Sequence, residues 1–186
     1  LHTAYRRQRQ MCIRDRFDET EQKLGKVDVL INNAGILKTA PLAESSDEMF
    51  ERTFSINVRG TFNTLREAAT RLNDGGRVVN FSSTTVAMNL PNYAVYSGSK
   101  AAVEVLTPIF AKEMRGRNIT VNAVAPGPVA TELFFNGKTE AQIQQFANMP
   151  PLQRLGQPDD IASTVAFLVG KDGGWINGQV CVSYTH

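Results

Sequence analysis

Histidine and cysteine are nearly missing from this sequence, which has two of each among 186 residues. His2 and His186 lie at the two ends, and Cys12 and Cys181 lie in or beside the terminal segments. The body of the chain therefore lacks the groups for a Ser-His-Asp triad, a cysteine nucleophile or a His/Cys zinc site. Any chemistry must use serine, tyrosine, lysine, asparagine and acidic side chains, and we expect no metal site.

Long apolar runs are also missing. No stretch approaches the roughly 20 apolar residues that a membrane helix needs, and the N-terminus lacks the basic-then-apolar order of a secretory signal. The composition is otherwise that of a globular protein, with enough length for one domain with a sizeable core. These features predict a cytoplasmic protein with no membrane partner.

The first sixteen residues differ from the rest, because they hold five arginines and one acidic residue and show no apolar period. An arginine-rich arm that binds nucleic acid is one interpretation. However, "MCIRDR" and the closing "SYTH" resemble translated sequencing adapters at the ends of metagenomic fragments. We therefore expect 1–16 and 182–186 to be non-native tails, 17–181 to form the domain, and no nucleic-acid partner.

Strand-like and helical patterns alternate along the rest of the chain. Strands turning into helices and back imply a parallel sheet that is covered on both faces, in one α/β unit. The strand-like runs are 27–31, 75–83, 118–127 and 174–182, and the helical patterns are 18–25, 45–72, 93–116 and 157–170.

The segment 45–72 predicts one long helix. Ser45 and Glu48 fit a capping box at its start. Apolar residues then recur at intervals of three and four, which predicts one apolar stripe facing the core. The stripe consists of Phe50, Phe54, Val58, Phe62, Leu65, Ala69 and Leu72.

Small and polar residues follow three of the predicted strands. They are "NNAG" at 32–35, "SS" at 82–83 and "PGPVAT" at 126–131. In an open α/β sheet, ligands bind outside the carboxyl ends of the strands. We therefore expect these three segments to lie together at one edge of the sheet and to form a binding site.

Tyr96 and Lys100 lie four residues apart in a helical pattern, so their side chains share one face. A phenol beside an ammonium titrates below its usual pKa of about 10, which predicts a usable acid near neutral pH. Ser83 can hold a carbonyl oxygen beside this phenol. Asn57 is a candidate to hold a relay water. Each feature alone is weak, because most Y-x-x-x-K pairs are exposed and a helix asparagine usually has protein partners.

Together these residues resemble the classical short-chain dehydrogenases/reductases from about Asp18 to Val180. The shared motifs are "NNAG", "NVRGTF", "GRVVNFSS", "YSGSK", "ITVNAVAPGPVATE" and "RLGQPDDIASTVAFL". The segments "GPVATELFFNGK" and "DGGWINGQV" are similar to the NADPH-dependent aldehyde reductase-like branch, which is also described as 3-oxoacyl-carrier-protein reductase. The resemblance implies hydride transfer between NADP(H), or else NAD(H), and the carbonyl carbon of a small-molecule aldehyde or ketone.

The resemblance also implies residue roles. Tyr96 is the expected general acid/base, Lys100 lowers its pKa and binds the nicotinamide ribose, and Ser83 polarises the carbonyl. Asn57 is expected to hold the relay water. The expected cofactor-binding residues are Asn33, Ala34 and Gly35 on the adenosine side, Pro126, Gly127, Val129 and Thr131 on the nicotinamide side, and Tyr96 and Lys100.

One family feature is missing, because no T-G-x-x-x-G-x-G occurs anywhere in the chain. We therefore expect a Rossmann-like doubly wound parallel sheet that lacks the first three strands and the Gly-rich loop. This fold leaves the strand 27–31 with an unpaired edge. Such a fragment should bind cofactor weakly and have little activity.

The segment 134–155 is where the family builds its substrate lid. "ELFF" (132–135) and "MPPL" (149–152) suggest apolar contacts and therefore a hydrophobic aldehyde or ketone. The family habit also implies a homodimer or homotetramer in the full-length parent, built partly on the two long helices. The alternatives are a non-enzymatic NAD(P)-binding regulator and an epimerase or dehydratase on the same fold.

Overall fold

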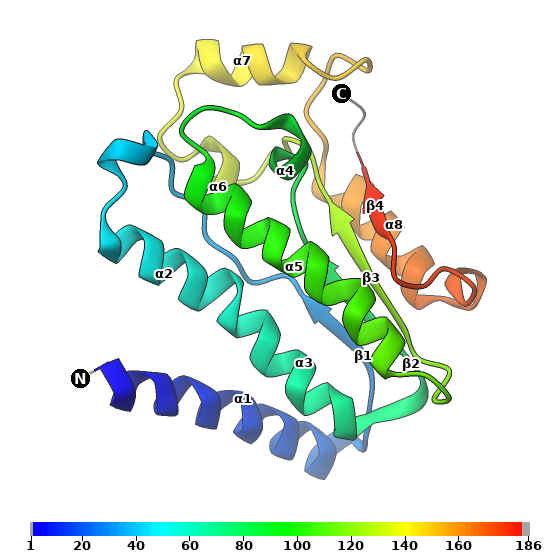
Figure 1. Cartoon of the computed structure of the whole chain (residues 1–186). Coiled ribbons are helices and arrows are strands. Elements are labelled where there is room, and N and C mark those ends of the chain that lie inside the picture. Colours follow the sequence, from blue (N-terminus) through cyan, green and yellow to red (C-terminus); the bar gives the residue numbers. More distant parts are fainter. Residues whose placement is uncertain (1, 184–186) are drawn as a thin grey trace.

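A four-stranded parallel sheet forms the centre of the computed structural model, which describes residues 2–183 and the side chains from residue 12 onward. Its strands lie in chain order, β1-β2-β3-β4 (Figure 1), and every neighbouring pair is parallel. They are β1 Val27–Asn32, β2 Leu72–Phe81, β3 Thr120–Ala125 and β4 Val180–Val182. The predicted Rossmann-like α/β sheet is confirmed, and in the described residues no strand precedes Val27.

Helices connect these strands. The α-helices are α1 His2–Leu24, α2 Asp47–Asn57, α3 Arg59–Arg71, α4 Thr85–Met88, α5 Ala94–Glu113, α6 Glu132–Phe135, α7 Glu140–Asn148 and α8 Pro158–Val169. Two short 3-10 helices are η1 Leu42–Glu44 and η2 Lys171–Gly173. No helix in 2–183 is long and apolar enough to cross a membrane.

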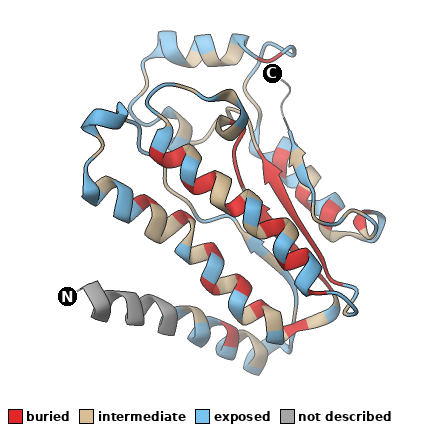
Figure 2. Cartoon of the chain, viewed as in Figure 1, coloured by how far each residue is buried: buried red, intermediate tan, exposed pale blue. Residues whose placement is uncertain are grey.

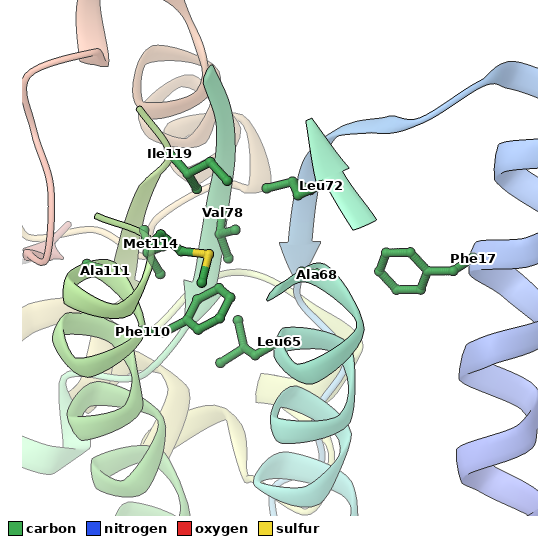
Figure 3. Close-up of a cluster of buried hydrophobic side chains, with 10 residues drawn as sticks. Phe17, Leu65, Ala68, Leu72, Val78, Phe110, Ala111, Met114 and Ile119 are labelled. Atoms are coloured by element: carbon green, nitrogen blue, oxygen red, sulfur yellow. The ribbon is translucent and has the colours of Figure 1, made fainter. Parts of the chain in front are cut away.

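Both faces of the sheet are covered, as β2 shows. Neighbouring residues on a strand point to opposite faces, and Val78 and Val79 are both buried in different clusters. Val78 packs with residues of α3 and α5, among them Leu65 and Phe110 (Figure 3). Val79 packs with Ile161, Val165 and Leu168 of α8 on the other face. Buried residues accordingly follow the central strands and the inner sides of the helices (Figure 2).

β1 lies at one edge of the sheet. It pairs with β2 alone among the described strands, and its side chains Val29 and Ile31 are exposed. The unpaired edge expected for the strand 27–31 is therefore present in the structure.

The helix before β1 includes the arginine-rich segment. Its C-terminus is at Leu24, before Gly25 with a φ of +86°, where only glycine is comfortable. Phe17 of this helix is buried in the core beside α3, and Arg71 forms ion pairs with Asp18 and Glu21. Of the two segments expected to be tails, residue 1 and residues 184–186 lie outside the described residues.

The long helix predicted over 45–72 is wrong in two respects. It is divided at Val58 into α2 and α3, and residues from Leu72 onward belong to β2. Its N-cap is Ser46, whose side chain accepts a hydrogen bond from the Met49 backbone N–H, whereas Ser45 bonds back to the Pro41 carbonyl. The N-cap therefore lies one residue later than predicted, and the predicted capping box is wrong, because the third helical residue is Met49.

The predicted apolar stripe is also wrong over its first half. Phe50 and Phe62 are 45% and 46% exposed, whereas Thr53 and Asn57 are each 1% exposed. The physical reason is that the inner face of α2 contacts α5 and the loop after β1 through polar groups. Only the second half of the segment, from Leu65 onward, buries apolar residues in the core.

Candidate active site

A cavity of about 700 Å³ opens at the carboxyl ends of β1, β2 and β3. Its walls include the loops that follow each of these strands, so the three segments expected at one edge do meet there. The candidate residues that line it are Asn33, Gly35, Ser83, Tyr96, Lys100, Pro126, Gly127, Val129 and Thr131. Ala34 is exposed and Asn57 is fully buried, and neither is part of this lining.

Tyr96 and Ser83 bring two hydroxyl groups together on the cavity wall. Tyr96 belongs to the first turn of α5, and Ser83 follows the last residue of β2 by two positions. Both are 8% exposed. The Ser83 hydroxyl lowers the pKa of the phenol, which offsets part of a larger increase from burial.

Burial raises the pKa of Tyr96 above its ordinary value. The loss of hydration destabilises the charged phenolate by more than the Ser83 hydroxyl stabilises it. Neighbouring Tyr93 raises it further. The lowered pKa expected from the Tyr96–Lys100 spacing is therefore not found. The reason is that the Lys100 ammonium, 5.9 Å from the phenol ring centroid, donates to the Phe81 backbone carbonyl at 2.8 Å instead.

Lys100 is itself strongly affected by burial. It is 5% exposed, and the loss of water around its ammonium lowers its pKa to about 8. Its Nζ still carries further N–H donors, since within the described residues it makes one hydrogen bond, to Phe81. A buried ammonium with spare donors on a cavity wall is suited to bind an oxygen-rich ligand group.

Asn57 is the last residue of α2. Its side-chain amide links this helix to the loop after β1 and to α5. Its Oδ1 accepts from the Ile36 backbone N–H at 2.9 Å, and its Nδ2 donates to the Ile36 carbonyl at 3.0 Å. The same Nδ2 donates to Ser99 Oγ at 2.9 Å, and Ser99 donates to the Tyr96 carbonyl at 2.6 Å. Asn57 thus ties the loop after β1 to the helical turn that holds Tyr96.

Gly35 lies where that loop approaches α5 most closely. A Cβ atom at this position would be 3.3 Å from both Asn57 Oδ1 and Lys100 Nζ. That spacing is tighter than ordinary packing allows. Because the glycine of "NNAG" has no side chain, the loop after β1 can approach the buried lysine closely.

The carboxyl ends of β1 and β2 are fixed by a buried polar chain. Thr64 donates to Asn32 Oδ1, Asn32 donates to Asn80 Oδ1, and Asn80 donates to Thr107 Oγ1, over 2.7, 2.8 and 3.0 Å. Asn80 is 0% exposed, and both its side-chain oxygen and its side-chain nitrogen have a hydrogen-bond partner. This chain of hydrogen bonds holds the two strand ends against α3 and α5.

Sequence reasoning missed several residues of the site. Ser99 was visible as the second serine of "YSGSK", but its bonds to Asn57 and Tyr96 depend on how α2 meets α5. Tyr93 also lines the cavity, with its ring 6.5 Å from that of Tyr96. Thr85, which bonds to Ser83, carried no motif signal at all.

Part of the cavity wall is apolar. Phe134 of α6 and Phe146 of α7 both line it and contact each other edge to face, with ring centroids 5.6 Å apart. Leu133 of the "ELFF" segment lines it too, but none of the residues 149–152 does, and Met149 and Leu152 are exposed. The expected contribution of "MPPL" is thus not borne out, because that segment turns toward the surface.

Comparison with known proteins supplies independent information. The family model described as enoyl-(acyl carrier protein) reductase matches residues 8–183. A short-chain type dehydrogenase/reductase of Picea abies is 48% identical over 168 residues, which cover 88% of this chain and 62% of the relative. An NADPH-dependent aldehyde reductase-like chloroplastic protein of Arabidopsis thaliana is 42% identical over 173 residues, covering 90% and 64% respectively.

Solved structures agree with this grouping. A putative dehydrogenase from Burkholderia cenocepacia with bound NADP matches with a TM-score of 0.90 at 30% identity, over 94% of this chain and 68% of the other. A blue fluorescent protein from a metagenomic library in complex with NADPH matches with a TM-score of 0.85 at 34% identity, over 91% and 68%.

Parallel strands whose carboxyl ends gather a serine, a tyrosine and a lysine around one cavity define a Rossmann-like α/β protein with a candidate active site. The chain belongs to the short-chain dehydrogenase/reductase family. It spans slightly less than two thirds of the length of the two curated relatives described above.

The lowered pKa of Lys100 makes stability depend on pH in a defined direction. Between its folded pKa of about 8 and the ordinary value of 10.5, the unfolded chain holds a proton that the folded chain has released. The free energy of unfolding of the wild type, relative to Lys100→Met, should therefore rise with pH through this window, by at most roughly 3 kcal/mol. Urea unfolding of both proteins from pH 7 to 9.5 measures this difference, and parallel curves would contradict it.

Proposed function

We propose that the protein reduces an aldehyde or ketone with NADP(H), and reversibly oxidises the alcohol. The observation that carries this proposal is the meeting of the Ser83 and Tyr96 hydroxyls on one wall of a cavity that also exposes Lys100. A carbonyl oxygen placed between two hydroxyl donors is polarised toward attack at its carbon. Membership in an oxidoreductase family supports the same chemistry.

In this proposal Tyr96 is the proton donor. Its raised pKa keeps the phenol protonated at neutral pH, as reduction requires, and the proton passes to the carbonyl oxygen as negative charge develops there. Ser83 donates a second hydrogen bond to the same oxygen. The Lys100 ammonium lies 5.9 Å from the centre of the Tyr96 ring, where its charge favours the phenolate that remains.

The chain's residues fit a nicotinamide cofactor. The cavity volume of about 700 Å³ is within the ordinary range for small-molecule sites. Lys100 would donate to ribose hydroxyls, while the loop 126–131 would contact the nicotinamide end and Asn33, Ala34 and Gly35 the adenosine side. When bound, the cofactor supplies the hydride. NADP(H) is favoured over NAD(H), because the relatives named above include an NADPH-dependent reductase and NADP-bound structures.

We propose that Asn57 binds the water that relays protons to the site. Both hydrogens of its amide are used by Ile36 and Ser99. A water at this position would therefore donate to an oxygen of Asn57 rather than accept from its amide. Its backbone carbonyl, which already accepts from Thr61 Oγ1 at 3.0 Å, has a second lone pair for this purpose.

Tyr96→Phe removes the proposed proton donor and leaves the ring that packs in the wall. We expect aldehyde turnover to fall roughly 100- to 10,000-fold, with the dissociation constant of NADPH changed less than about threefold. Steady-state kinetics and the fluorescence of bound NADPH, with NADH alongside, measure the two effects. Retained turnover would overturn the role of Tyr96, and NADPH binding without any turnover in the wild type would favour the non-enzymatic regulator.

These measurements need two forms of the protein, because we further propose that the chain is a fragment of a longer enzyme. The chain itself should bind NADPH weakly. A completed protein, with the N-terminal strands of a relative joined before residue 17, should bind at micromolar levels. Micromolar binding by the chain alone would remove the fragment proposal and leave the proposed reaction in place.

The substrate is proposed to be a hydrophobic aldehyde or ketone. Part of the cavity wall is built from apolar side chains of α4, α6 and α7 and of the loops that follow β1 and α4. They are Leu37, Met88, Leu90, Leu133, Phe134 and Phe146. An alkyl or aromatic substituent on the carbonyl would be buried there, where each Å² of apolar surface removed from water contributes about 25 cal/mol.

Phe134→Ala tests this wall. For octanal we expect kcat/KM to fall roughly tenfold to a hundredfold, because burying one Phe side chain contributes about 1.5–3 kcal/mol. For propanal, which is too short to cover this side chain, we expect a much smaller fall in kcat/KM. Phe135→Ala is the matched control, because Phe135 is the next residue of α6, is 40% exposed and does not line the cavity. Equal losses for both aldehydes would contradict the proposal.

We also propose that the full-length protein forms homodimers or homotetramers through α2, α3 and α5. These helices lie side by side on one face of the sheet (Figure 1). They expose apolar side chains that the core does not use, namely Phe50, Phe62, Val105 and Ile109. Apolar side chains of this kind on adjoining helices are typical of an interface between subunits.

Phe62→Glu should shift the completed protein toward monomer, because burying an unpaired carboxylate in an interface is costly. Phe167→Glu is the control, since Phe167 has nearly the same exposure, 47% against 46%, but belongs to α8 on the opposite face. Sedimentation equilibrium measures both. An assembly that survives Phe62→Glu and is lost with Phe167→Glu would place the interface on the other face.

A further inference from the structure

The hydroxyl of Ser83 accepts two hydrogen bonds from a single neighbour, Thr85. The Thr85 backbone N–H donates to Ser83 Oγ over 3.3 Å, and the Thr85 Oγ1 hydroxyl donates to the same oxygen over 3.1 Å. A serine hydroxyl has two acceptor lone pairs and one hydrogen. With both lone pairs occupied, the Ser83 hydroxyl is left to act as a donor.

Ser83 and Tyr96 both line the cavity, where the Ser83 hydroxyl lowers the pKa of the Tyr96 phenol. That direction is the one expected when Ser83 donates toward the phenol and stabilises the phenolate. Donation from Thr85 into Ser83 also polarises the Ser83 O–H and strengthens its own donation, because hydrogen bonds in a chain reinforce one another.

Thr85 is in turn fixed to the helix that carries Tyr96. Its backbone carbonyl accepts from Ser97 Oγ over 3.1 Å, and Ser97 is the residue that follows Tyr96 on α5. Thr85 is also the first residue of α4, directly after the loop from β2. One residue thus connects the strand end that holds Ser83 with the helical turn that holds Tyr96.

We propose that Thr85 is a positioning residue that fixes the Ser83 hydroxyl as a hydrogen-bond donor to the carbonyl oxygen that Tyr96 protonates. The proposal rests on the carbonyl-reductase function proposed above. Thr85 acts through Ser83 and needs no contact with the reacting atoms. Without the Thr85 hydroxyl, only the Thr85 backbone N–H still donates to Ser83. The Ser83 hydrogen can then point elsewhere for part of the time, which weakens the support of negative charge on both the substrate oxygen and the phenolate.

The next residue along the same loop gives a matched control. Thr84 also lines the cavity and is 4% exposed, but its hydroxyl donates to the Pro126 carbonyl over 3.3 Å, away from Ser83. Thr84→Val therefore removes a hydroxyl from the same loop without changing the bonds of Ser83. Thr85→Ser restores the hydroxyl that Thr85→Val removes.

The first experiment follows the phenol itself and needs no turnover. The chain is labelled with 3-fluorotyrosine, whose fluorine lowers the phenol pKa into a milder range, and the 19F signal missing from Tyr96→Phe is titrated. Two titratable groups face this phenol, Tyr93 at the N-cap of α5 and Lys100 on α5, and the β2 loop presents the Ser83 hydroxyl. We expect Thr85→Val to raise the pKa of residue 96 by about half a unit or more, and Thr85→Ser and Thr84→Val to leave it near the wild-type value.

The second experiment measures aldehyde reduction by the same variants in the completed protein. Thr85→Val should lower kcat roughly tenfold with KM changed less than about twofold, because donation to the developing oxyanion matters most in the transition state. Thr85→Ser should recover most of the rate. Urea unfolding of each variant shows whether a fall in kcat comes only from misfolding. The 19F spectrum and the rate of Thr85→Ser give the same check.

The two experiments separate the inference from the function on which it rests. An unchanged titration and an unchanged kcat in folded Thr85→Val overturn the role of Thr85, and the reductase function stands if Tyr96→Phe still abolishes turnover. If no form of the protein reduces a carbonyl, the proposed function fails, and the pKa shift still decides whether Thr85 fixes the Ser83 hydroxyl.

Discussion

The buried amide of Asn57 is the constraint on which the rest of the site depends. It pairs with both backbone groups of Ile36 and with Ser99, and so joins the loop after β1, the end of α2 and the start of α5. A buried amide that loses such partners costs about 1–3 kcal/mol for each unsatisfied group. The arrangement also explains why α2 ends at this residue and why Gly35, pressed between Asn57 and Lys100, has no side chain.

Burial has opposite consequences for the two titratable groups of the site. It raises the pKa of the Tyr96 phenol and lowers that of the Lys100 ammonium, so both groups shift toward their neutral forms. A phenol that stays protonated suits proton donation, whereas a lysine with a pKa of about 8 is easily biased by a ligand that brings negative charge. Beside this pair, Thr85 donates its hydroxyl to Ser83 and accepts from Ser97 with its backbone carbonyl, so serine and threonine groups, and no histidine, surround the phenol.

Much of the fold was predictable because local patterns and tertiary structure agree there. The strand 27–31, the helix ending at Gly170 and the parallel sheet follow from apolar runs, a proline at the helix start and glycine stops. The helix 45–72 failed for a physical reason. Periodicity assumes that the apolar face is the buried face, but here Thr53 and Asn57 are buried, Asn57 through its hydrogen bonds, and Phe50 is 45% exposed.

The sequence alone determined the parallel α/β class, the family resemblance and the residues available for chemistry, because these depend on residue type, spacing and periodicity. Tertiary structure alone decided how those residues are used. The bond from Lys100 to the Phe81 carbonyl, the burial that raises the pKa of Tyr96, and the two bonds from Thr85 to Ser83 depend on how β2, its following loop and α5 meet. Hydrogen-bond direction and loss of water are properties of a packed site, and no spacing in the chain encodes them.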